Sequence, residues 1–129
     1  MTAALIVVIA EALIGGAVVS AECRGCHEYE QVAVAATVRH RVQASGLTGV
    51  AVMAAPYQYA TPARPELVTW RHVAAYARGR WGDAPEWAEG ATHFVARRID
   101  ARVSERWARR GLVPVESGPT AHVFYAPRG

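Results

Sequence analysis

The chain contains no lysine, and all 14 of its basic residues are arginines. Eleven acidic residues leave a net charge of +3, with an isoelectric point near 9.2. Such mild basicity suits any polyanion, including cell-wall polymer, nucleic acid and membrane surface, and does not choose among them. Charged residues make up only 19% and apolar residues 52%, which excludes a disordered chain and predicts a globular protein.

Internal repeats, low-complexity tracts and linkers are also lacking. A length of 129 residues fits one domain and is enough to bury a core. We therefore expect a single domain over residues 1–129.

No basic residue precedes Arg24, and residues 3–21 are almost wholly apolar. A signal peptide normally begins with positive charge, and Glu11 interrupts a stretch that would otherwise suit a membrane span. Residues 18–21 nevertheless imitate a small-residue cleavage site. A core helix with Glu11 facing an edge or a substrate cleft is the preferred interpretation. A secretory segment and a membrane anchor stay open, although we expect no stable span.

Helical patterns dominate the middle of the chain. Residues 28–44 contain no glycine or proline and predict a helix, which Gly46 and Gly49 should end. Residues 54–66 contain three prolines and predict a loop. Helical spacing predicts an amphipathic helix over residues 70–81. Its apolar face should comprise Trp70, Val73, Ala74, Ala77 and Trp81.

Two short aromatic and β-branched runs, residues 91–95 and 122–125, predict strands that pair with each other. Between them, residues 104–110 predict one or two helical turns with Ser104 as the cap. The expected fold class is α+β, mainly α, with a short hairpin or sheet near the C-terminus.

Cysteine is scarce, and both copies fall within residues 23–27 (CRGCH). This is the pattern that attaches a c-type haem, so an electron-carrying cytochrome is one alternative, with Met53 as the second axial ligand. The two cysteines also suit a disulfide, two free thiols or no role. A four-ligand zinc site would need two histidines, and no H-x₃₋₅-H pair supplies them. We therefore predict no metal site.

Glu22 follows the apolar N-terminal segment and precedes the glycine-containing turn at Gly25. Partial burial at such a place raises the pKa of a carboxyl group, because the ion loses water. A carboxyl group that stays protonated near neutral pH suits general acid catalysis of glycoside cleavage. Glu28 and Glu30 stand at a predicted helix start, where they more simply satisfy the helix dipole.

Several blocks of the sequence resemble the SleB/CwlJ-type cell wall hydrolases, which include the spore-cortex-lytic enzymes. The family pattern runs roughly A-E-A-R-G-E, then G-Q-V-A-V-A-A-V and N-R-V, and it is matched by residues 19–25, 31–38 and 41–42. Weaker matches follow at residues 57–59, 90–94, 107 and 122–125. Cys23, Cys26 and His40 depart from the pattern, and the two cysteines create the C-x-x-C-H string.

The resemblance implies a lysozyme-like, mainly α domain that cleaves the β-1,4 bond between N-acetylmuramic acid and N-acetylglucosamine. The implied enzyme is a lytic transglycosylase with Glu22 as its one catalytic carboxyl group and no cofactor. Its implied partners are peptidoglycan glycan strands and, for a phage enzyme, other virion or tail proteins. Its expected location is the cell envelope, the extracellular space or the virion. A catalytically inactive module of the same fold remains an alternative.

Substrate-binding roles are further hypotheses. Tyr57, Gln58 and Tyr59 are predicted to form one wall of a sugar cleft, with ordinary loop packing as the alternative. His93 and Tyr125 are predicted to line the opposite wall, with cross-strand packing as the alternative. His122 is expected to hold strand geometry. The arginine run at positions 97, 98, 102, 106, 109 and 110 predicts a solvated helix face or a polyanion contact. Nucleic acid is not expected, since only Trp107 interleaves that run.

Overall fold

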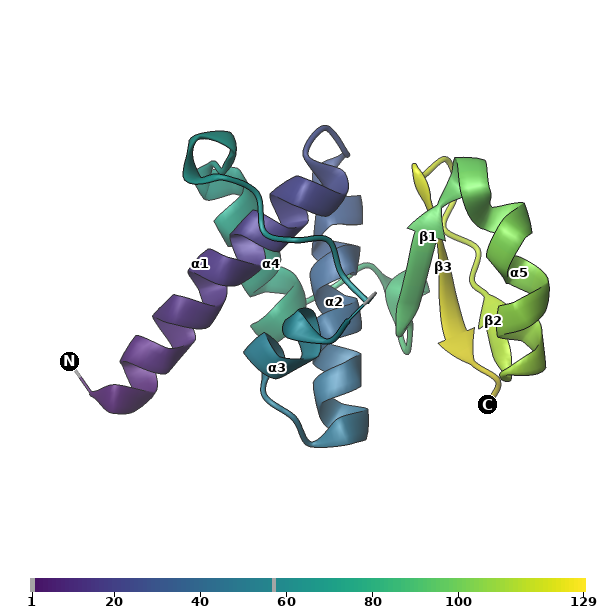
Figure 1. Ribbon diagram of the computed structural model, residues 1–129, viewed down its shortest axis with the longest axis horizontal. Helices are drawn as coiled ribbons and strands as arrows, with labels where there is room; N and C mark the ends of the chain where they lie inside the picture. The colour runs from purple at the N-terminus through teal and green to yellow at the C-terminus, as the bar shows by residue number, and fades with distance from the viewer. Residues whose placement is uncertain (1, 57) are drawn as a thin grey trace.

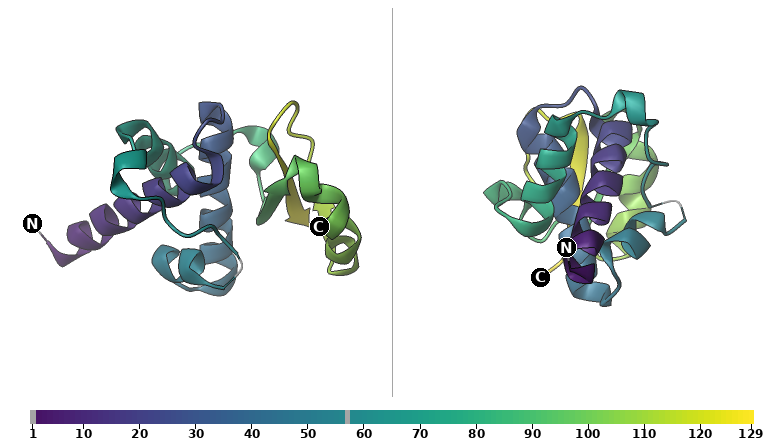
Figure 2. Two further views of the ribbon diagram at one scale, coloured as in Figure 1. Left: turned by 45° about the horizontal axis from the view of Figure 1, so that its top comes forward. Right: turned by 90° about the vertical axis from the view of Figure 1, so that its left-hand side faces the viewer.

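The computed structural model describes residues 2–56 and 58–129, and it confirms a mainly α fold with a small antiparallel sheet (Figure 1). Four helices, α1 to α4, lie on one side of the sheet, and α5 lies on the other (Figures 1 and 2). The longer helices are α1 (Ala3–Cys23), α2 (Glu28–Ser45), α3 (Gly49–Ala54), α4 (Trp70–Trp81) and α5 (Asp100–Arg109). Single 3-10 turns occur at η1 (Pro65–Leu67), η2 (Glu86–Ala88) and η3 (Arg97–Ile99). The strands are β1 (His93–Ala96), β2 (Leu112–Pro114) and β3 (His122–Pro127).

Helix α2 is the centre of the molecule, as its small apolar residues suggest. Every residue from Glu30 to Val38 is buried, because other elements surround this part of the helix. The helix ends at Gly46, whose φ of 73° is the left-handed conformation that glycine adopts without steric cost. Gly49 was predicted to end this helix as well, but it is the first residue of α3, a short helix that the sequence reading missed.

Helix α4 has the predicted bounds but buries a different face. The buried residues are His72, Ala75, Tyr76 and Gly79, whereas Trp70 is 79% exposed and Trp81 43% exposed. The predicted apolar face is therefore wrong. The two polar side chains on the buried face have hydrogen-bond partners. The Tyr76 hydroxyl donates to Glu11, and the ring of His72 accepts from the backbone N–H of Thr69 at the helix start.

The sheet has the order β1-β3-β2 and is antiparallel throughout. The predicted strand pair is confirmed, with His93 opposite Tyr125 and Phe94 opposite Phe124. Alternation along each strand turns Phe94, Ala96, His122 and Phe124 toward the helical layer, where Phe94 and Phe124 join its core. On the other face, Val123 and Tyr125 form a second cluster with Leu112, and Trp107 of α5 packs against it.

The segment between these strands differs from the prediction. Helix α5 begins at Asp100 after a 3-10 turn, so Ser104 lies within the helix and is not its cap. Strand β2 was not predicted, because a run of three residues carries too little periodicity.

Helix α1 is a core helix only in its C-terminal half. Glu11 is 6% exposed and accepts hydrogen bonds from Arg80 Nε at 2.8 Å and from the Tyr76 hydroxyl at 2.6 Å. The carboxylate thus faces α4 and not an open cleft. Residues 5–9 remain exposed on a stem that projects from the domain (Figure 1). By length and composition α1 is apolar enough to cross a membrane, although a third of its most apolar window is buried in the fold.

Gly79 gives the first prediction. A Cβ atom there would collide with the backbone of Val32 and with Ala35, because α2 and α4 approach each other closely at this glycine. Gly79→Ala should lower the free energy of unfolding by about 2 kcal/mol despite its better helix propensity. Ala74→Val on the exposed side of α4 is the control and should cost less than about 1 kcal/mol. Urea unfolding measures both, and a neutral Gly79→Ala would contradict this packing.

Candidate functional site

Glu22 lies in the last turn of α1 and is half-buried. The backbone N–H of Ala60 donates a hydrogen bond to its Oε1 at 3.0 Å, which ties the carboxyl group to the loop after α3. Burial raises the pKa of Glu22, and it outweighs the Ala60 hydrogen bond and the charge of His122, both of which act in the opposite direction. A raised pKa is what a proton donor requires.

Glu22 lines an open hollow of about 480 Å³. The hollow is lined by the turn at residues 23–26 and by the adjoining ends of β1 and β3, at Ala96, Ala121 and His122. Arg24 and Arg98 also line it, and neither was predicted as a site residue. Among the residues that line the hollow, Glu22 is the one carboxylate. The site therefore combines one acid with two arginines.

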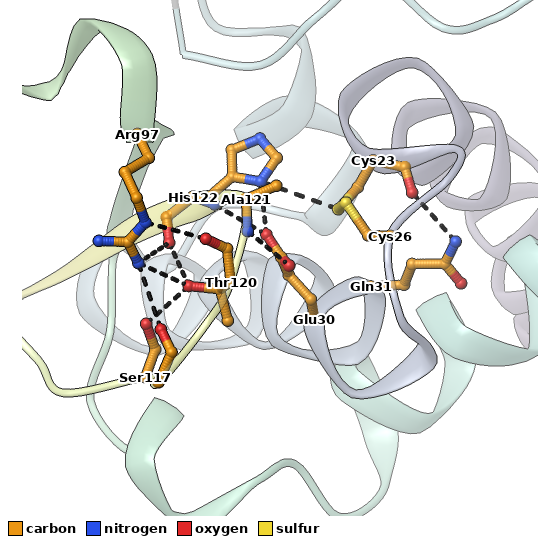
Figure 3. A network of polar contacts seen from close by, with 10 residues as sticks. Cys23, Cys26, Glu30, Gln31, Arg97, Ser117, Thr120, Ala121 and His122 are labelled. Atoms are coloured by element: carbon orange, nitrogen blue, oxygen red, sulfur yellow. Dashed lines mark hydrogen bonds and ion pairs between the residues drawn. A yellow bond between two sulfur atoms is a disulfide. The ribbon is translucent and has the colours of Figure 1, made fainter.

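Glu30 corrects the assignment made from its place at a helix start. Its side chain is 3% exposed and accepts three hydrogen bonds: from the backbone of Ala121 and of His122, each at 2.9 Å, and from His122 Nδ1 at 2.7 Å (Figure 3). Burial alone would raise the pKa of Glu30, but these donors and the charge of His122 together lower it. His122 holds strand geometry as expected, with Glu30 as the partner that sequence reasoning missed.

The Cys23 and Cys26 sulfur atoms are joined in a disulfide, which resolves the alternatives left open for them. Cys23 is buried, and its Sγ lies 3.8 Å from His122 Nδ1. His27 caps α2, where its ring accepts from the Tyr29 backbone and packs against the Tyr29 ring. A c-type haem needs two free thiols and an axial histidine. In this oxidised form the two sulfur atoms are bonded to each other and His27 caps a helix, so the string does not present a haem site.

The aromatic loop contributes less to the hollow than predicted. Tyr57 lies outside the described residues. The Gln58 amide oxygen accepts from Arg41, away from Glu22's hollow. Tyr59 turns its hydroxyl inward to Thr37 Oγ1 at 2.9 Å and packs its ring against Phe94. These contacts are those of loop packing, although Tyr59 and Ala60 together place the backbone N–H that reaches Glu22.

His93 and Tyr125 are paired across β1 and β3, but on the opposite sheet face from Glu22 and His122. Both rings pack against Trp107, and the Tyr125 hydroxyl donates to Asp100 at 2.5 Å. The structure thus brings these two residues together and separates them from Glu22, so they do not form a second wall of its hollow. His93 lines a different, smaller hollow of about 220 Å³ beside Arg41, Arg106 and Arg110, and Gln58 lies there as well.

The arginine run is divided among several environments. Arg97 donates to the carbonyl oxygen atoms of Thr120 and His122 and so fixes the start of β3. Arg98 faces Glu22's hollow, and Arg109 pairs with Glu105 along α5. The run is therefore not one continuous solvated face.

His93 gives the second prediction. Burial, followed by the charges of Arg41 and Arg110, lowers the pKa of His93 from 6.5 to about 4. The unfolded chain therefore binds a proton between these values that the folded chain does not, and stability must fall as pH drops through this window. Between pH 7 and pH 5, His93→Gln should lose about 1 kcal/mol less than wild type, allowing for the half-exposed ring. Urea unfolding at several pH values tests this. Above pH 7.5 the free energies of unfolding of wild type and His93→Gln should change with pH in the same way.

Comparison of the chain with protein-family models, curated proteins and solved structures finds no match. The resemblance to the cell wall hydrolases therefore rests on the sequence motifs alone.

Proposed function

We propose that this protein cleaves the β-1,4 bond between N-acetylmuramic acid and N-acetylglucosamine as a lytic transglycosylase, with Glu22 as its single acid–base group. The observation that carries the proposal is the position of Glu22: half-buried, fixed by the Ala60 N–H, and facing a hollow lined by no second carboxylate. The motif around residues 19–25 supplies the substrate class.

The mechanism needs one carboxyl group with two successive roles. Protonated Glu22 gives its proton to the glycosidic oxygen, and the bond to the muramyl C1 breaks. The carboxylate then takes the proton of the muramyl C6 hydroxyl, whose oxygen bonds to C1 and closes a 1,6-anhydro ring. The Ala60 N–H occupies Oε1, which leaves Oε2 as the oxygen atom for proton transfer. Most glycosidases that use water or a covalent intermediate have a second carboxylate near the first.

Arg24 and Arg98 favour an anionic substrate in the same hollow. Muropeptides carry carboxylates on their lactyl-peptide branches, and guanidinium groups bind carboxylates with charge-assisted hydrogen bonds. Binding of an anionic glycan also agrees with the protein's net charge of +3. The proposal places the protein's action at peptidoglycan, in the cell envelope, outside the cell or as part of a virion with its tail proteins.

The third prediction concerns Glu22→Gln. The amide oxygen can still accept from Ala60, but the side chain can no longer donate or take a proton, so clearing of purified sacculi should fall by about 10²–10⁴-fold. The melting temperature should stay near that of wild type. Glu28→Gln is the matched control, because Glu28 is exposed and its partner is Arg78. Equal clearing by Glu22→Gln and wild type would contradict the assignment, and no clearing by wild type would favour an inactive module.

The fourth prediction concerns the product. Mass spectrometry of muropeptides released from sacculi should find muramyl ends that lack one water relative to hydrolysed ends, because the C6 oxygen replaces water as the nucleophile. Hen-type lysozyme digestion of the same sacculi provides the hydrolysed reference. Reducing muramyl ends alone would contradict the one-carboxylate mechanism while leaving Glu22 as the acid.

A further inference from the structure

Four potential metal ligands converge beside the hollow from segments far apart in the sequence. Cys23 ends α1, Cys26 lies in the following turn, Glu30 lies in the first turn of α2, and His122 begins β3 (Figure 3). One ligand atom from each lies within 4.8 Å of every other. Cys23, Glu30 and His122 are buried, and Cys26 is half-buried at the hollow. The set is thus enclosed, with one side open to an entering ion.

The donor chemistry is that of a tetrahedral zinc site. Zinc sites in proteins use cysteine sulfur, histidine nitrogen and carboxylate oxygen, and pairs of cysteines are typically separated by two to four residues. Bond lengths of about 2.0 to 2.3 Å imply ligand atoms about 3.3 to 3.8 Å apart. The separation of 3.8 Å between Cys23 Sγ and His122 Nδ1 already meets this requirement. The Glu30–His122 contact at 2.7 Å would open as the ion enters.

The surroundings already hold the ligands in the way that outer-shell groups do in metal sites. Glu30 is oriented by the backbone N–H groups of Ala121 and His122. The Gln31 amide donates to the Cys23 carbonyl at 3.0 Å, which fixes the end of α1. Arg97 holds the backbone of His122 from the other side. These contacts do not depend on the bond between the two sulfurs, so they can persist when that bond is broken.

We propose that the reduced protein binds one Zn²⁺ through Cys23, Cys26, Glu30 and His122, and that the disulfide is the metal-free form of the same site. A dithiol reductant supplies two electrons and two protons, becomes a disulfide itself, and leaves two thiols. Zn²⁺ then displaces both thiol protons and forms two zinc–sulfur bonds, with His122 Nδ1 and a Glu30 oxygen completing the set. In the reverse direction a disulfide oxidant accepts two electrons and two protons and becomes two thiols, the bond between the Cys23 and Cys26 sulfur atoms forms again, and Zn²⁺ is released.

The test uses the full chain, stripped of metal and compared with and without prior reduction by a phosphine. Zn²⁺ is titrated against a chromophoric chelator, and Co²⁺ serves as a spectroscopic probe. The reduced chain should bind one ion, and Co²⁺ should show thiolate-to-metal charge-transfer absorption and tetrahedral d–d bands. The oxidised chain should show neither. No uptake after reduction, or equal uptake by the oxidised chain, would overturn the proposal.

Variants identify the ligands. Cys26→Ser and His122→Gln should each weaken zinc binding by about 100-fold or more, since each removes one of four ligands. His27→Asn is the matched control: it alters the histidine of the C-x-x-C-H string, keeps a capping side chain and should leave affinity unchanged. Loss of binding in His27→Asn with retention in His122→Gln would overturn the ligand set.

Two measurements on the wild-type chain guard against variants that fail to fold. X-ray absorption of the zinc-loaded protein should give two sulfur and two nitrogen or oxygen neighbours; four sulfurs or none would contradict the site. Urea unfolding should weaken zinc binding strongly, because the fold brings Glu30 and His122 to the cysteines, and unchanged affinity in urea would likewise contradict it. None of these readouts uses murein cleavage, so their failure is distinct from failure of the proposed function.

Discussion

The carboxylate of Glu30 joins the helical layer to the sheet. It is buried at the first turn of the central helix and takes the two backbone N–H groups that open β3 together with the ring of His122. A buried N–H without a partner costs about 1–3 kcal/mol, so one side chain satisfies a strand start that would otherwise be expensive. His40 and Arg41 of α2 donate to the backbone carbonyl groups of Ala91 and Thr92 and so attach the start of β1 to the same helix. Polar contacts, and not apolar packing alone, therefore fix how the sheet meets α2.

The hollow beside Glu22 is a product of that junction. The turn that follows α1 and the adjoining ends of β1 and β3 line it, and the loop after α3 supplies the N–H that holds the carboxyl group. None of these segments forms a site alone. Glu22, both cysteines and His122 line this hollow, so the proposed acid and three of the four proposed zinc ligands lie in one place.

The residues that depart from the cell wall hydrolase pattern have clear structural uses here. Cys23 and Cys26 form a disulfide that closes the turn between α1 and α2. His40 bonds the Ala91 carbonyl at 2.6 Å and so supports the start of the sheet. The C-x-x-C-H string that favoured haem from spacing alone is divided in three dimensions: the sulfurs face His122, whereas His27 caps a helix. Spacing along the chain could not separate these uses, because it carries no information about distant partners.

Local pattern in the sequence determined the longer helices and the pairing of two strands, but not the short elements α3 and β2. The absence of glycine and proline predicted α2, helical spacing predicted the bounds of α4, and β-branched and aromatic runs predicted that β1 pairs with β3. It also singled out Glu22 by its place before a turn. Tertiary structure decided which face of α4 is buried, because the partner of the Tyr76 hydroxyl is Glu11 on α1. It also put His93 and Tyr125 on the sheet face opposite to that of His122. It brought His122 into contact with Cys23, which lies 99 residues earlier in the sequence. Periodicity reports a residue's nearest neighbours along an element, whereas burial and ligand geometry depend on how the layers meet.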